Sequence, residues 1–312
     1  MNIKSMVGII ILMIGLCPRV VNAVLIAYDP FLNANVAGGG NRRGEGEYNA
    51  GSQFRDFTNG NNNNVTGGPI VGWSALAKWT GNSGAAAGAN DKIIGPTDSS
   101  GLSFGRNRVQ GGNVQARGAK NKSPNNPDTV SFARRSLDSY AGNSVYYISA
   151  LMRADTATIR NNLNINAMVG FSAEMGLEAF DGSGFAGAIF GFHGNGRQVD
   201  LVVRYRDISG KSVNSVIISK IPGGITYFVV LKLEYNAEDD NERLTVWLNP
   251  QSPNERGTDP VLVATGSMLS SETQLTTGGF WMNNFNSGIN DYVRFDELRL
   301  GTEWSDVVAV TK

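Results

Sequence analysis

A short apolar pattern near the C-terminus limits what the chain can fold into more than any other feature. Val293 and Phe295 share one parity, whereas Leu298 and Leu300 are apolar on the opposite parity. Because side chains of a β-strand alternate between the two faces of a sheet, a regular strand would turn one of these pairs outward. One extra residue at Asp296-Glu297 would bring both pairs to the same face. The sequence therefore predicts a closing strand with a β-bulge at two adjacent acids.

Period-2 alternation also runs through most of the chain beyond Ser144. Apolar residues alternate with polar ones in 165–175, 199–205 and 225–235. Asn195-Gly196 between two such runs is typical of a tight hairpin. Strands spaced about 8–12 residues apart, without sustained helical periodicity, indicate a sandwich or a barrel. We therefore predict an all-β fold, an antiparallel β-sandwich.

The N-terminal half carries weaker signals. We expect a first strand at Val24–Tyr28 beside the closing strand, and short strands further on, among them Leu102–Phe104. Residues 33–68 are rich in Gly and Asn and have little to bury, so we expect long loops that are partly disordered. Residues 24–312 are predicted to form a single sandwich domain.

The first 23 residues have the pattern of a secretory signal peptide. Lys4 precedes the apolar run Met6–Leu16, and Val21-Asn22-Ala23 offers small or allowed residues at a cleavage site. The run is shorter than the roughly 20 residues of a membrane span, so we expect cleavage after Ala23, with an uncleaved anchor as the alternative. The one cysteine, Cys17, would leave with this leader, so the exported protein would hold no disulfide. We expect a secreted or cell-surface protein.

The charge balance excludes two classes of partner. The chain has 27 Lys and Arg and 27 Asp and Glu. Nucleic acid binding needs a net basic surface, and so does attraction to an anionic membrane. We therefore expect neither nucleic acid nor a polybasic membrane contact.

The closing segment also carries a resemblance. Phe295–Gly301, which reads FDELRLG, resembles the last strand of laminin-G-like, concanavalin A-like jelly rolls. Its continuation through Trp304–Val307 resembles a group of secreted bacterial sandwich proteins, many of which end in a sorting tail; the residues after Val308 are too few for one. Three earlier segments resemble that group too: 27–31, 67–74 and 131–137. The resemblance implies a jelly roll and export, and no single activity.

Two glutamates are candidate catalytic residues. Glu174 and Glu178 are four apart on the polar parity of a strand pattern, and retaining glycosidases need two nearby carboxylates. The concanavalin A-like glucanases carry Glu-x-Asp-x-Glu, and here Gly176 stands in place of the assisting acid. A solvated strand edge is the alternative. His193, the only histidine, flanks the predicted hairpin turn and cannot build a multi-histidine metal site.

Aromatic and amide side chains are candidates for sugar binding. Trp247 has the parity opposite to its apolar neighbours, so it would face outward unless another layer covers it. Trp281 and Asn283 lie in a segment where aromatic and amide groups interleave. Rings can stack on the C–H faces of sugars and amides can bond hydroxyls, although core packing is the alternative for both tryptophans.

Acidic residues give a candidate Ca²⁺ site. Asp239 and Asp240 lie in an acidic hairpin loop, and Asp296 lies in the closing strand. Oxygen ligands suit Ca²⁺, but the spacing does not match an EF-hand loop. A solvated loop for the first two, and a hydrogen bond that stabilises the bulge for Asp296, are the alternatives. No other cofactor is expected.

These observations favour a secreted, non-enzymatic interaction module that meets glycans at the cell surface or in the matrix. The first alternative is a glycoside hydrolase that uses Glu174 and Glu178. The second is a purely structural exported protein without a small ligand.

Overall fold

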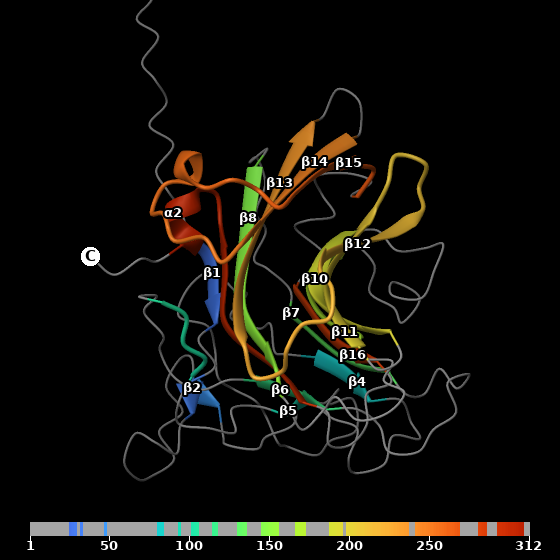
Figure 1. Ribbon diagram of the computed structural model, residues 1–312, viewed down its shortest axis with the longest axis vertical. Coiled ribbons are helices and arrows are strands. Elements are labelled where there is room, and N and C mark those ends of the chain that lie inside the picture. Colours follow the sequence, from blue (N-terminus) through green and yellow to red (C-terminus); the bar gives the residue numbers. More distant parts are fainter. Residues whose placement is uncertain are drawn as a thin grey trace, which may run out of the picture.

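The computed structural model is built almost entirely from antiparallel strands (Figure 1). It describes residues 25–29, 32–33, 47–48, 80–83, 93–94, 101–105, 114–117, 130–135, 145–155, 166–172, 187–195, 198–236, 241–268, 280–285 and 292–308. Within them, the helical elements are two single turns, η4 (Glu255–Gly257) and α2 (Trp304–Val307). No helix in the described ranges is long and apolar enough to cross a membrane.

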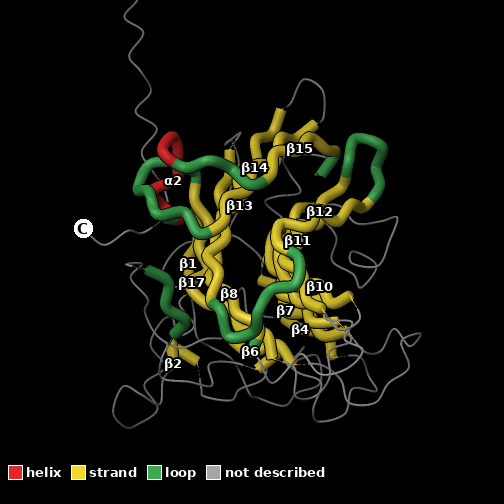
Figure 2. The backbone as a smooth tube through the Cα atoms, in the orientation of Figure 1, coloured by secondary structure: helices red, strands yellow, loops and turns green. Residues whose placement is uncertain are grey.

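Two sheets face each other across the core (Figure 2). The eight-stranded sheet has the order β15 (Leu262–Gly266), β14 (Asn241–Leu248), β13 (Thr226–Asn236), β8 (Val145–Ala154), β17 (Tyr292–Gly301), β6 (Val114–Arg117), β5 (Ile93–Ile94), and β1 (Leu25–Asp29) also pairs with β17. The seven-stranded sheet has the order β12 (Ser212–Ile218), β11 (Gln198–Arg206), β10 (Gly187–Asn195), β9 (Asn166–Ser172), β16 (Phe280–Phe285), β7 (Val130–Arg135), β4 (Thr80–Ser83). A small parallel pair joins β2 (Leu32–Asn33) to β3 (Glu47–Tyr48).

The chain wraps around both sheets in a jelly-roll manner. Strands β6 to β9 alternate between the sheets, and β15, β16 and β17 do so again. Consequently β17 lies between β8 and β6 in one sheet, and β16 lies between β9 and β7 in the other. The prediction of an antiparallel all-β sandwich is confirmed.

The closing strand contains the predicted β-bulge. Asp296 pairs with Leu151 and Arg299 pairs with Ser149, so two residues of β17 oppose one residue of β8. Glu297, one of the two, has a φ of 50°. Apolar residues on both sides of the bulge therefore face the same core: Val293, Phe295, Leu298 and Leu300. The bulge prediction is confirmed.

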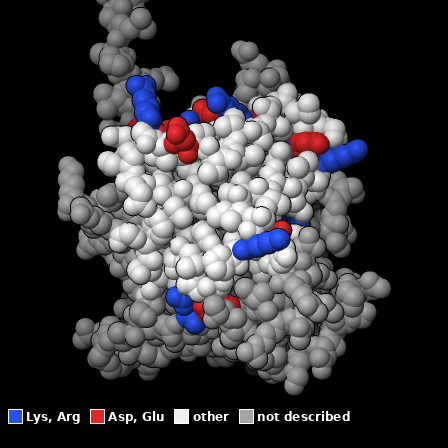
Figure 3. Space-filling model, viewed as in Figure 1, with Lys and Arg blue, Asp and Glu red and all other residues white. Residues whose placement is uncertain are grey.

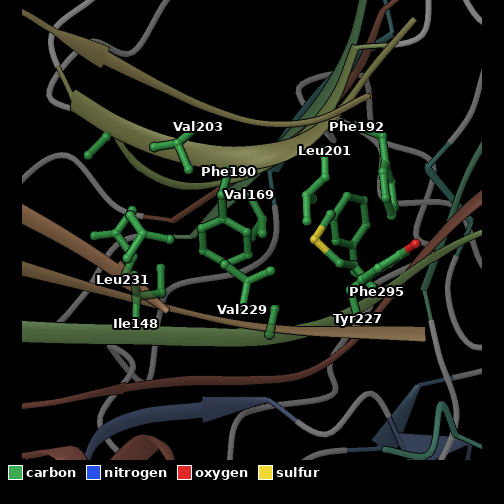
Figure 4. Packing of buried hydrophobic residues seen from close by; sticks show 14 of the residues in the cluster. Ile148, Val169, Phe190, Phe192, Leu201, Val203, Tyr227, Val229, Leu231 and Phe295 are labelled. Atoms are coloured by element: carbon green, nitrogen blue, oxygen red, sulfur yellow. The ribbon is translucent and has the colours of Figure 1, made fainter. Parts of the chain in front are cut away.

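The main core lies between the two sheets (Figure 4). Phe190, Val203 and Val169 from the seven-stranded sheet pack toward Ile148 and Leu231 from the eight-stranded sheet, and all five are buried. In each of these strands every second residue faces this core, as the sequence pattern predicts. This placement turns the intervening residues of both sheets away from the core.

The local predictions can be compared strand by strand. A hairpin between β10 and β11 is confirmed, but Asn195 pairs with Gln198, so Asn195 is the last residue of β10 and not a turn residue as predicted. The first strand does lie beside the closing strand, with Asp29 opposite Leu298. The strand predicted at Leu102–Phe104 is wrong: this segment is irregular, and Leu102 donates its N–H to a side chain, not to a neighbouring strand. The extent of a single domain over 24–312 stays a prediction.

Candidate ligand-binding face

The outer face of the eight-stranded sheet is closed by a second apolar cluster. Tyr147 and Trp247 point away from the main core and pack against Trp304 of α2, and Phe228, in the same cluster, packs against Phe104. The indole rings of Trp247 and Trp304 lie edge to face, 5.0 Å between centroids. The buried members are Leu102, Tyr147, Leu151, Phe228, Val230, Trp247, Trp304, Val307 and Val308. A ligand on this side of the protein would meet a covered surface.

The loop of residues 249–260, which we call the strap, is hydrogen-bonded to three aromatic side chains of this cluster. The indole N–H groups of Trp304 and Trp247 donate to the carbonyl oxygens of Ser252 and Thr258, at 3.2 and 3.0 Å. Between these points, Glu255 accepts a hydrogen bond from the Tyr147 hydroxyl at 2.7 Å. Burial, together with this bond, raises the pKa of the Tyr147 hydroxyl well above its ordinary value. The hydroxyl therefore stays protonated at neutral pH and can donate this hydrogen bond.

The same arrangement decides where Trp247 lies. Its parity does turn it to the outer face, as the sequence predicts, but the second cluster covers it and leaves it 3% exposed. The residues that cover it, Trp304 and the strap, are distant in sequence. Trp247 offers no open ring face to a sugar, which corrects its interpretation as a surface stacking residue.

Asp296 is part of the fold of the closing strand. Its side chain is fully buried, Oδ1 accepts the Glu297 N–H at 2.8 Å, and Oδ2 accepts the Leu102 N–H at 2.7 Å. Both oxygens thus bond backbone groups, one at the bulge and one on the segment packed over the sheet. Among the described residues there is no group of three or more His, Cys, Asp or Glu that could hold a metal ion. The alternative role of Asp296, a hydrogen bond at the bulge, is the one observed.

Other residues of the closing motif also have visible structural roles. Gly301 lies where an added Cβ would collide with the Asp306 side chain. Asp306 Oδ2 accepts the N–H groups of Thr302 and Glu303 at 3.1 and 2.9 Å, in a capping box that begins α2. The motif therefore specifies the β-bulge, the close contact between Gly301 and Asp306, and the cap of α2. Together these features place Trp304 against the outer face of the sheet.

The outer face of the seven-stranded sheet has a different character. We name its part on β10, β11 and β12 the β10–β12 face, defined by His193, Asp200, Arg204, Asn214 and Val216. These residues alternate with core residues, and the pairings His193–Asp200, Arg204–Asn214 and Val202–Val216 place them on one side of the sheet. The middle of the sheet is buried, whereas Asn214 and Val216 on the edge strand are exposed. The β10–β12 face therefore runs from a buried centre to an open margin.

Hydrogen bonds hold the polar groups of the β10–β12 face in place. Arg204 is 8% exposed, and its Nε donates to Asn214 Oδ1 at 2.7 Å. Asp200 Oδ1 accepts the Lys220 N–H at 2.8 Å. Burial, followed by the nearby Arg204 charge, lowers the pKa of His193 below its ordinary value, and Asp200 opposes this shift. The imidazole is therefore neutral at pH 7.

The sheet register relates two predicted sugar-binding residues to this face. Trp281 pairs with Gly170, which pairs with Ile189, which pairs with Arg204, so all share one row across the sheet. A neighbouring row connects Asn283 to Val216 through Met168, Gly191 and Val202. The structure describes the backbone of Trp281 and Asn283 but not their side chains. Gly170 has a φ of 155°, and a Cβ there would collide with the Ala188 carbonyl oxygen, so β9 and β10 approach closely at this row.

The remaining candidates lie outside the described residues: Glu174, Glu178, Asp239 and Asp240. Sequence reasoning missed Arg204 and Asn214. Their signal was present, because both are polar residues that alternate with apolar ones, but only the register shows that they are paired. On the described part of the surface in Figure 3, charges of both signs lie scattered among uncharged residues, in agreement with the balanced composition.

Comparisons with known proteins add structural neighbours. No protein family model matches the chain, and no curated protein matches it. Among solved structures, the alginate lyase Aly36B is 14% identical with a TM-score of 0.41, over 62% of this chain and 82% of that one. The endo-β-1,4-glucuronan lyase from the fungus Trichoderma reesei is 14% identical with a TM-score of 0.39, over 66% and 88%. The T. cruzi calreticulin globular domain is 10% identical with a TM-score of 0.37, over 62% and 73%. Similarity at this level supports no statement about ligand or activity, and the laminin-G-like resemblance stays a prediction.

Proposed function

We propose that this protein is a glycan-binding module that holds its ligand against the β10–β12 face, without chemistry. The observation that carries the proposal is the Arg204–Asn214 pair beside Val216, which is 54% exposed. Sugars present hydroxyl groups and apolar C–H faces together, so an amide next to exposed methyl groups suits both. On the outer face of the eight-stranded sheet, the second cluster buries Trp247 and Trp304, so neither ring is open to a sugar there.

A pair of matched substitutions tests this placement. Val216 on β12 and Val263 on β15 are exposed valines on edge strands of different sheets, at 54% and 49%. Val216→Ser should weaken binding several-fold, whereas Val263→Ser should leave binding unchanged; neither should alter the melting temperature much, because both side chains already face water. The ligand is chosen from a panel of dextran, starch, chitin oligosaccharides and polygalacturonate, titrated against the full chain by calorimetry.

The result can contradict the proposal in two ways. If the wild type binds no member of the panel, glycan binding is refuted and the purely structural alternative is favoured. If Val263→Ser weakens binding as much as Val216→Ser, binding is real but the β10–β12 face is not the site.

The hydrolase alternative is separated by a different measurement. Glu174 and Glu178 lie outside the described residues, so the geometry neither unites nor divides them. Incubation of the wild type with each polysaccharide, followed by measurement of new reducing ends, should give no increase over buffer under the binding proposal. A rate that disappears in Glu174→Gln would establish the hydrolase instead.

We further propose that the protein acts outside the cell after its leader is removed. The support is the Lys4 charge, the apolar run Met6–Leu16 that follows it, and Val21-Asn22-Ala23 as an allowed cleavage site. Expression in a host with a secretory pathway, followed by N-terminal sequencing of the exported chain, should give Val24 as the first residue. An intact N-terminus on cell-associated protein would contradict cleavage.

A further inference from the structure

The Arg204–Asn214 pair determines which end of an exposed amide can meet a ligand. Arg204 Nε donates to Asn214 Oδ1 at 2.7 Å. A guanidinium has donors only, so the amide must turn its oxygen toward Arg204 and its nitrogen, Nδ2, elsewhere. Asn214 is exposed on β12, and no acceptor within the described ranges is assigned to Nδ2. The pair therefore presents an oriented hydrogen-bond donor at the margin of the sheet.

The surroundings of Asn214 favour a chain-like ligand along β12. Ser212 and Val216 flank Asn214 at two-residue spacing, and all three are exposed on the same side of the strand. Two residues of an extended strand span about 7 Å. A ligand lying along β12 would meet a hydroxyl, an oriented amide and methyl groups in turn. Arg204 is 8% exposed, and its hydrogen bond to Oδ1 favours the one amide orientation in which Nδ2 faces away from the guanidinium.

We propose that Asn214 is the specificity-determining residue of the β10–β12 face, and that its Nδ2 donates to an oxygen acceptor of the bound glycan. The acceptor is a hydroxyl, ring or carboxylate oxygen, and a group that offers only donors at this position is rejected. Arg204 is a positioning residue that acts through Asn214. This inference rests on the proposed glycan-binding function.

The substitution Asn214→Asp removes the donor and keeps the partner. An aspartate still offers an oxygen to Arg204 Nε, and the added charge strengthens that bond, so the melting temperature should stay the same or rise. Binding of neutral polysaccharides should weaken about tenfold, because one hydrogen bond to the ligand is lost. Binding of polygalacturonate should weaken more than that, because the new carboxylate repels the carboxylates of the ligand.

The matched control is Asn254→Asp. Asn254 is also exposed and lies on the strap, which covers the other sheet. Its substitution adds the same negative charge as Asn214→Asp. It should leave binding unchanged for every member of the panel. The ratio of neutral to carboxylated ligand affinity is informative, because a purely structural role of Asn214 would weaken both classes equally.

The outcomes separate the inference from the function on which it rests. If the wild type binds no panel member, the proposed function fails and this inference fails with it. If the wild type binds and Asn214→Asp binds equally well, the inference is overturned while glycan binding stands. Weaker binding by Asn254→Asp to the same extent would also overturn it, since the effect would then come from net charge alone.

Discussion

The buried carboxylate of Asp296 gives the sharpest test of how the closing strand is held. Its two oxygens accept the N–H groups of Glu297 at 2.8 Å and of Leu102 at 2.7 Å, and its side chain is fully buried. A hydrogen bond to a charged group contributes about 1.5–3 kcal/mol to stability, so the pair contributes about 3–6 kcal/mol. Asp296→Asn keeps one acceptor and places an NH₂ donor against a backbone donor, at a cost of about 2–3 kcal/mol. Asp296→Ala removes both acceptors.

The assay is denaturation by guanidinium chloride, followed by tryptophan fluorescence, to which the buried Trp247 and Trp304 contribute. Asp296→Asn should shift the midpoint to lower denaturant without a change of slope, by an amount that corresponds to about 2–3 kcal/mol. Asp296→Ala should shift it further. The matched control, Asp259→Asn on the exposed end of the strap, should remain within about 0.5 kcal/mol of the wild type. The reasoning is refuted if Asp296→Asn shifts the midpoint no more than this control.

Three further outcomes are expected. Gly301→Ala should lower the free energy of unfolding by about 1–3 kcal/mol in the same titration, because the new Cβ meets the Asp306 side chain; a neutral effect would show that the approach is not tight. The pKa of His193 is lowered in the folded protein, so the free energy of unfolding should fall as the pH drops below the ordinary value of about 6.5. His193→Gln should remove that part of the pH dependence. If the melting temperatures of the wild type and His193→Gln fall by the same amount between pH 8 and pH 5, the assignment is contradicted. Trp304→Phe removes the N–H that bonds Ser252 and should cost about 1–2 kcal/mol, measurable by thermal unfolding, whereas no loss would show that the strap is held by other contacts.

The sequence predicted the closing strand well because local rules were sufficient there. The parity change between Phe295 and Leu298 has one economical explanation, an extra residue between them, and the structure contains it. The hairpin between β10 and β11 was predictable for the same reason, since turn signals are local, although Asn195 proved to be the last strand residue and not part of the turn. Both predictions needed only the residues of the segment itself.

Predictions failed where the result depends on residues far apart in the sequence. Trp247 has outward parity, but α2 lies over it, and no pattern around position 247 reports that cover. The strand expected at Leu102–Phe104 is irregular because Leu102 bonds a side chain 194 positions away. That Arg204 and Asn214 are partners could not be predicted from their positions in the sequence, because only the register of β11 and β12 places them side by side. Tertiary cover and strand register therefore account for what local pattern reading missed.

Hydrogen exchange of the full chain, with and without a saturating amount of the polysaccharide it binds best, tests the assignment of the β10–β12 face most directly. Amides of β11 and β12, residues 198–218, should exchange more slowly in the complex, and those of the strap, 249–260, should be unaffected. Slower exchange confined to the strap and α2, or no change anywhere at saturation, would contradict the account.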